Sequence, residues 1–130
     1  MSTEINISEQ ISMAIDLKKH RLRVHKQTLR LLGSPPYVQL LFSTKMEAIV
    51  ILARKTAVPG GQEIKVVFDK NSNAGTFDIY SKELISRIQE QYAGLNDRVL
   101  YRLIGYELKE ESGVCFPLST LIRTEEPHVP

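Results

Sequence analysis

The chain has 130 residues, of which 42% are hydrophobic and 25% are charged, and its formal net charge at pH 7 is +2. These values exclude a large multidomain protein and a globally disordered chain, and they indicate one domain or two very small ones that share a core. The single cysteine, Cys115, excludes an internal disulfide framework, and no apolar run has the length of a membrane span, so we expect a cytoplasmic protein with no membrane partner.

The first half of the chain has the pattern of two strands, a short helix and a hairpin of two more strands. The strands are expected at residues 11–17, 21–25, 37–43 and 48–53. In the second of them, Leu22 and Val24 alternate with charged residues, so this apolar pair would face the core. The helix of about two turns begins at Lys26, and Gly33 is placed as its C-terminal cap.

Residues 56–62, TAVPGGQ, indicate a linker, because Pro59-Gly60-Gly61 fits neither a strand nor the interior of a helix. The same order of elements returns after the linker. Strands are expected at residues 64–69, 76–80, 98–108 and 113–119, and a helix at residues 82–92. Ser81 is the expected N-cap of that helix.

The expected order of elements (strand, strand, helix, strand, strand) therefore occurs twice in the chain. We predict a mostly β protein with short helices, built from two tandem β-β-α-β-β repeats that share a β-rich core. The repeats are expected at residues 11–55 and 63–120, with the linker at 56–62 and tails at 1–10 and 121–130.

The two repeats differ in charge. Residues 1–60 carry nine Lys or Arg and four acids, whereas residues 61–130 carry eight Lys or Arg and eleven acids. The basic residues concentrate in LKKHRLRVHKQTLR, residues 17–30, which contain six Lys or Arg and no acid. Such a surface either attracts an anionic partner or is a solvated face that keeps the protein soluble.

The segment HRLRVHKQTLRLLG, followed by YVQLLF and AIVILA, resembles the AbrB/MazE/SpoVT family of swapped-hairpin DNA-binding domains. Two copies in one chain are similar to the arrangement in MraZ-type proteins. The resemblance implies that Arg21, which opens the second strand, and Arg30 of the short helix approach DNA. The chain departs from the family pattern at His20, His25 and Leu29, where the family has glycine, proline and often a second helix arginine.

The second repeat loses the basic pattern. Thr76, Asp78 and Ile85 stand at the positions that correspond to Arg21, Arg23 and Arg30 of the first repeat. If both repeats fold together as an intrachain pseudo-dimer, only one half of the paired surface is basic, which weakens DNA binding. A homodimer that places two basic faces side by side is the form in which DNA binding would be strongest.

We therefore predict a non-enzymatic, transcription-regulator-like protein that contacts the phosphates of duplex DNA through a basic strand-helix face. The expected contacts are Lys18, Lys19, Arg21, Arg23, Lys26 and Arg30. The alternative is a protein-interaction or structural module that kept this fold without DNA binding and docks an acidic protein partner.

The sequence gives no reason to expect a catalytic site, a cofactor or a metal. His20 and His25 are separated by an odd number of residues, so on a strand their side chains would point to opposite faces. Cys115 lies in the apolar run GVCFPL and is expected to be a small buried residue rather than a nucleophile.

Overall fold

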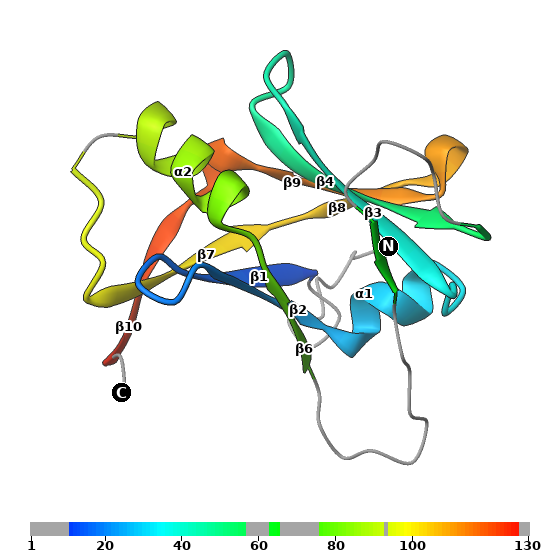
Figure 1. Ribbon diagram of the computed structural model, residues 1–130, viewed down its shortest axis with the longest axis horizontal. Helices are drawn as coiled ribbons and strands as arrows, with labels where there is room; N and C mark the ends of the chain where they lie inside the picture. The colour runs from blue at the N-terminus through cyan, green and yellow to red at the C-terminus, as the bar shows by residue number, and fades with distance from the viewer. Residues whose placement is uncertain (1–10, 57–62, 66–75, 93, 128–130) are drawn as a thin grey trace, which may run out of the picture.

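The computed structural model describes residues 11–56, 63–65, 76–92 and 94–127, and it shows two antiparallel five-stranded sheets with few short helices (Figure 1). The mostly β fold is thereby confirmed. Sheet A contains β1 (Ser12–Asp16), β2 (Arg21–His25), β6 (Thr76–Tyr80), β7 (Val99–Ile104) and β10 (Ile122–Pro127). Sheet B contains β3 (Tyr37–Ser43), β4 (Ala48–Arg54), β5 (Glu63–Lys65), β8 (Tyr106–Leu108) and β9 (Gly113–Pro117). The helices are α1 (Lys26–Leu31) and α2 (Lys82–Gln91), and two single turns of 3-10 helix are η2 (Lys109–Glu111) and η3 (Leu118–Thr120).

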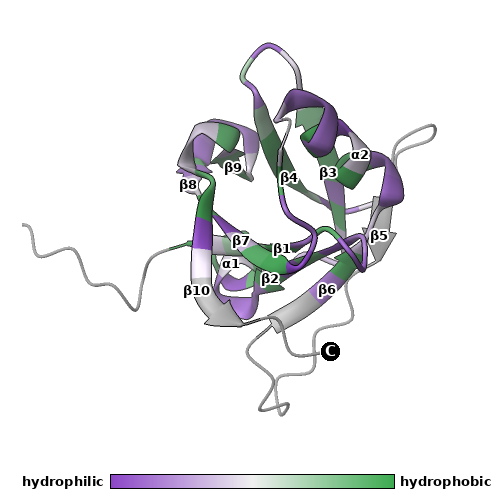
Figure 2. Ribbon diagram, turned by 90° about the vertical axis from the view of Figure 1, so that its left-hand side faces the viewer, coloured by the Kyte–Doolittle hydropathy of each residue, from purple (hydrophilic) through white to green (hydrophobic). Residues whose placement is uncertain are grey.

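The core lies between the two sheets. Leu22 and Val24 of β2 have no exposed surface, as their alternation with charged residues predicted, and they belong to one apolar cluster with residues of sheet B such as Ile49 and Phe116. In Figure 2, sheet A lies below sheet B, and hydrophobic positions occur in both. Burial of such side chains at about 25 cal/mol per Å² is the main force that holds the sheets together.

One end of each helix is closed as its sequence indicates. Gly33 has a φ of +82°, and the N–H of Ser34 donates to the carbonyl of Leu29, which closes the C-terminal end of α1. The N–H of Leu84 donates to Ser81 Oγ at 3.2 Å, so Ser81 is the N-cap of α2.

The two helices lie on opposite sides of the molecule (Figures 1 and 2). Neither of these described helices has the length and apolar character that crossing a membrane requires.

Each sheet combines strands from both halves of the chain. The strand order is β10-β7-β1-β2-β6 in sheet A and β5-β3-β4-β9-β8 in sheet B. The first strand of the chain, β1, pairs with β7 of the second half, and β5 of the second half pairs with β3 of the first half. In addition β2 pairs with β6, and β4 with β9. The halves are therefore interleaved within one chain.

The strand predicted over residues 98–108 is in fact two strands in different sheets. The chain leaves sheet A after β7 and enters sheet B at β8, with Gly105 between them. A Cβ at Gly105 would lie 2.7 Å from the ring of Phe116, so the crossing brings the backbone too close to the core for a side chain. The hairpin predicted from 98–108 and 113–119 is accordingly correct only for β8 with β9, because β7 pairs with β1 and β10.

The chain end was also predicted incorrectly. Residues 121–130 were expected to be a tail, but Ile122–Pro127 forms β10 at the edge of sheet A. Of the second-half strand expected at 64–69, only the start falls in described structure, as β5 (Glu63–Lys65). The expected tail at 1–10 and nearly all of the linker at 56–62 lie outside the described residues.

Candidate nucleic-acid interface

The six predicted contact residues lie along β2 and beyond both of its ends. Lys18 and Lys19 are on the turn before β2, whereas Lys26 and Arg30 are on α1 after it. Since five strand residues span roughly 16 Å, the turn and α1 are well separated. Figure 1 shows this turn and α1 at opposite ends of β2. The structure therefore does not bring the six residues together at one point.

Arg23 is held by a carboxylate from the second half of the chain. Its Nε and Nη2 donate to Oδ1 and Oδ2 of Asp78 at 2.8 and 3.2 Å, a bidentate arrangement. The hydrogen bonds to Asp78 raise the pKa of Arg23, and the guanidinium in turn holds the pKa of Asp78 below its usual value. The Arg23 side chain is still 42% exposed, so a further anion can reach it.

Arg21 is held by Asp16 of β1. Its Nη2 lies 3.2 Å from Asp16 Oδ2, and its Nη1 lies 3.9 Å from Asp78 Oδ2. The other oxygen of Asp16 accepts a hydrogen bond from the backbone N–H of Lys19 at 3.1 Å. Because the side chains of Arg21 and Asp16 are only 15% and 3% exposed, Arg21 contributes to the fold more than to the surface.

The remaining predicted residues differ in accessibility. Lys18 and Lys19 are exposed on the β1–β2 turn, and Arg30 is exposed in the last turn of α1. Lys26 is buried, with 9% of its surface exposed, so its position argues against a direct contact with DNA.

Arg102 of β7 is a basic residue of this surface that the sequence did not indicate. The strand registers place five residues in one row across sheet A: Ile122, Arg102, Ala14, Arg23 and Asp78. Paired residues point to the same face, and this is the face away from the core. Arg102 is exposed, and at two strand spacings its Cα lies roughly 10 Å from that of Arg23.

We call the outer side of sheet A with its β1–β2 turn the basic face. Its described charged residues are Lys18, Lys19, Arg21, Arg23 and Arg102, together with Asp16 and Asp78. Five cations and two carboxylates leave a net charge of +3 on this part of the described surface. The face thus attracts anions, although less strongly than the sequence alone suggested.

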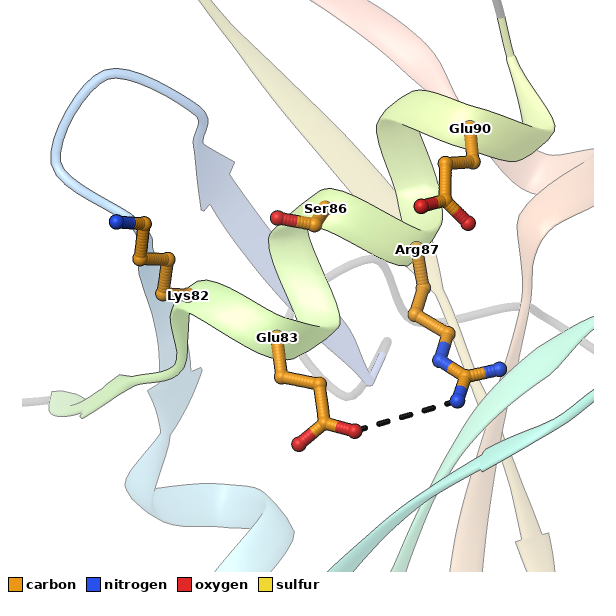
Figure 3. Close-up of a pocket in the computed structure, with 5 residues that line it drawn as sticks. All are labelled: Lys82, Glu83, Ser86, Arg87 and Glu90. Atoms are coloured by element: carbon orange, nitrogen blue, oxygen red, sulfur yellow. Dashed lines mark ion pairs between the residues drawn. The ribbon is translucent and has the colours of Figure 1, made fainter.

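A surface pocket on α2 has no such preference. Its volume is about 680 Å³, and all five lining residues come from that helix: Lys82, Glu83, Ser86, Arg87 and Glu90 (Figure 3). Arg87 Nη2 lies 4.0 Å from Glu83 Oε1. Its two cations and two carboxylates cancel, so the pocket has no net charge with which to attract anions.

The structure places Cys115 in a packing position. Cys115 is fully buried on the side of sheet B that faces away from the main core, as expected of a small packing residue. Its interaction with Tyr106 raises the pKa of that phenol. No three His, Cys, Asp or Glu side chains form a possible metal site within the described part of the chain.

No family model matches the chain, and neither the curated proteins nor the solved structures give a significant match. A function for the chain therefore has to follow from its own residues.

Proposed function

We propose that the protein is a non-enzymatic DNA-binding protein of the transcription-regulator kind, which contacts the phosphates of duplex DNA through the basic face. The observation that carries the proposal is the net charge of +3 among the described charged side chains of the basic face, with Lys18 and Lys19 exposed at its edge. Phosphates bind such a face because neutralising them releases condensed counterions.

The two ion pairs reduce the number of phosphates that the face can neutralise. Arg21 is mostly buried against Asp16, whereas Arg23 keeps an exposed part of its guanidinium. Lys18, Lys19 and Arg102 complete the accessible set. Four contacts correspond to a slope of log K against log salt of roughly −3.5, compared with roughly −5 for six.

The proposed architecture is that of two interleaved β-β-α-β-β copies, similar to AbrB-type swapped hairpins. The reciprocal strand pairs support it: β1 of the first half pairs with β7, and β5 of the second half pairs with β3. Such an exchange is expected if each half supplies a first strand to the other.

The second candidate function is a protein-interaction or structural module. The pairs Arg21–Asp16 and Arg23–Asp78 favour it, because they engage two of the six predicted contact residues inside the fold. In that case Lys18, Lys19 and Arg102 would dock an acidic protein.

The experiment is fluorescence anisotropy with a labelled duplex at about 50 and about 200 mM salt. The variant Lys18→Ala/Lys19→Ala should bind several-fold more weakly, and its salt slope should be less steep by about 2. The matched control is Lys45→Ala/Lys109→Ala, which removes two exposed lysines from the β3–β4 turn and η2 with the same change in net charge.

Equal losses in both double variants would show that net charge alone, and no particular face, attracts DNA. Absence of binding at low salt would end the DNA proposal and leave the interaction module.

A further inference from the structure

The central residues of two strands carry opposite charges and lie directly opposite each other. Arg23 is the third of five residues in β2 (Arg21–His25), and Asp78 is the third of five in β6 (Thr76–Tyr80). The antiparallel register pairs Arg23 with Asp78, and the pairing extends two residues to either side. The two strands are therefore paired symmetrically about their midpoints, and the bidentate ion pair at 2.8 and 3.2 Å marks that point.

The pairing of β4 with β9, which joins the halves in sheet B, carries no charge. β4 and β9 meet through Ala48–Pro117, Ile49–Phe116, Val50–Cys115, Ile51–Val114 and Leu52–Gly113. Apolar pairs of this kind accept many apolar neighbours, so they do not determine which strand is chosen as a partner. A charge pair does determine the partner, because the two charges that face each other must be of opposite sign.

Opposite charges at the midpoint distinguish β6 from a second copy of β2. If β2 paired with the β2 of another molecule in the same register, Arg23 would face Arg23. If β6 paired with another β6, Asp78 would face Asp78. Like charges directly opposite each other on antiparallel strands are destabilising, whereas opposite charges stabilise the pair.

We propose that the Arg23–Asp78 pair fixes the partner of β2 as a β6 strand, either of the same chain or of a second copy that exchanges halves, and excludes self-pairing of either half. Arg21 adds to the selection, because its Nη1 lies 3.9 Å from the same carboxylate of Asp78. This selection of strand partners does not depend on DNA binding.

The test uses two full-length variants with single charge reversals, Arg23→Asp and Asp78→Arg. Each variant alone has like charges at the midpoint, so it should melt at a lower temperature than wild type.

In a mixture, however, the β2 strand of the Arg23→Asp chain is acidic at its midpoint and complements the basic midpoint of β6 in the Asp78→Arg chain. The two strands that keep their native residues are complementary as well. Co-refolding the two variants should therefore give a swapped heterodimer with twice the chain mass of 14.8 kDa, measured by light scattering after gel filtration.

Two controls accompany the mixture. The double reversal Arg23→Asp/Asp78→Arg should regain most of the lost melting temperature as a single chain. The uncharged variant Arg23→Gln/Asp78→Asn has no charge repulsion at the midpoint to oppose self-pairing, so refolding it should give more of the double-mass species than wild type does.

If either single variant fails to fold alone, recovery of folded protein from the mixture supports the proposal equally well. A mixture that contains only the species of the separate variants, with their separate melting temperatures, would overturn it. A double reversal that melts no higher than the single ones would do the same.

Discussion

The carboxylate of Asp16 contacts both the side chain of Arg21 and the backbone of the turn that separates the two residues. One carboxylate oxygen is 3.2 Å from Arg21 Nη2, and the other accepts the N–H of Lys19 at 3.1 Å. The β1–β2 turn that presents the exposed lysines is thus fixed by a nearly buried acid. The same acid partly neutralises the strand that follows.

Replacing Asp16 by Asn should therefore destabilise the protein, because Arg21 would lose its charged partner in a site that is only 15% exposed. We expect the free energy of unfolding in urea to fall by about 2–3 kcal/mol. Asp97→Asn, at an exposed position, is the matched control and should change it by less than about 0.5 kcal/mol. Equal small effects in both variants would contradict a structural role for Asp16.

The Arg23–Asp78 pair should make stability depend on pH in the acid range. The hydrogen bonds from Arg23 lower the pKa of Asp78 from its ordinary value of 3.8, so the unfolded chain binds the proton more readily than the folded one. The stabilisation is then fully present above the ordinary pKa and is lost as the pH falls through the folded value.

The melting temperature of wild type should consequently approach that of Asp78→Asn as the pH falls from about 5 to about 2. Arg23→Gln removes the cause of the lowered pKa and should show the same weakened pH dependence as Asp78→Asn. A difference between wild type and Asp78→Asn that stays constant over this range would mean that Asp78 contributes no pH-dependent stability.

Local patterns predicted most of the described elements. The alternation in RLRVH indicated β2, and the positions of Ser81 and Gly33 indicated one end of each helix; all three agree with the structure. These signals act over a few residues, through side-chain periodicity or backbone hydrogen bonds, so a single segment contains them.

The contacts that the sequence patterns could not predict are those between residues far apart in the chain. Asp78 is 55 residues from Arg23, and only the β2–β6 register brings them together. The sequence of residues 17–30 therefore gives no sign that an acid pairs with one of its arginines. Arg102 joins the basic face only because β7 pairs with β1. The change of sheet at Gly105 likewise depends on Phe116 of another strand.

A buried hydroxyl in α1 offers a stabilising substitution. Thr28 is 1% exposed, and its Oγ1 has no hydrogen-bond partner within the described structure. Thr28→Val keeps the branched shape and removes the unsatisfied group, so the free energy of unfolding should rise by about 1 kcal/mol. Thr44→Val, on the exposed β3–β4 turn, is the control and should have little effect. A destabilised Thr28→Val protein would show that the hydroxyl has a partner after all.

The crossing between the sheets should not tolerate a side chain at Gly105. A Cβ there would lie 2.7 Å from two ring carbons of Phe116 and 3.0 Å from the carbonyl oxygen of Cys115, so Gly105→Ala should lower the free energy of unfolding by roughly 1–3 kcal/mol. Phe116→Leu removes the ring and should itself cost about 1–2 kcal/mol through lost packing. If the ring is the obstacle, the double variant should lose less than the sum of the two single losses, because the smaller leucine side chain makes room for the new methyl group. Additive losses in urea unfolding would instead assign the strain to the backbone contact with Cys115, which no side-chain change relieves.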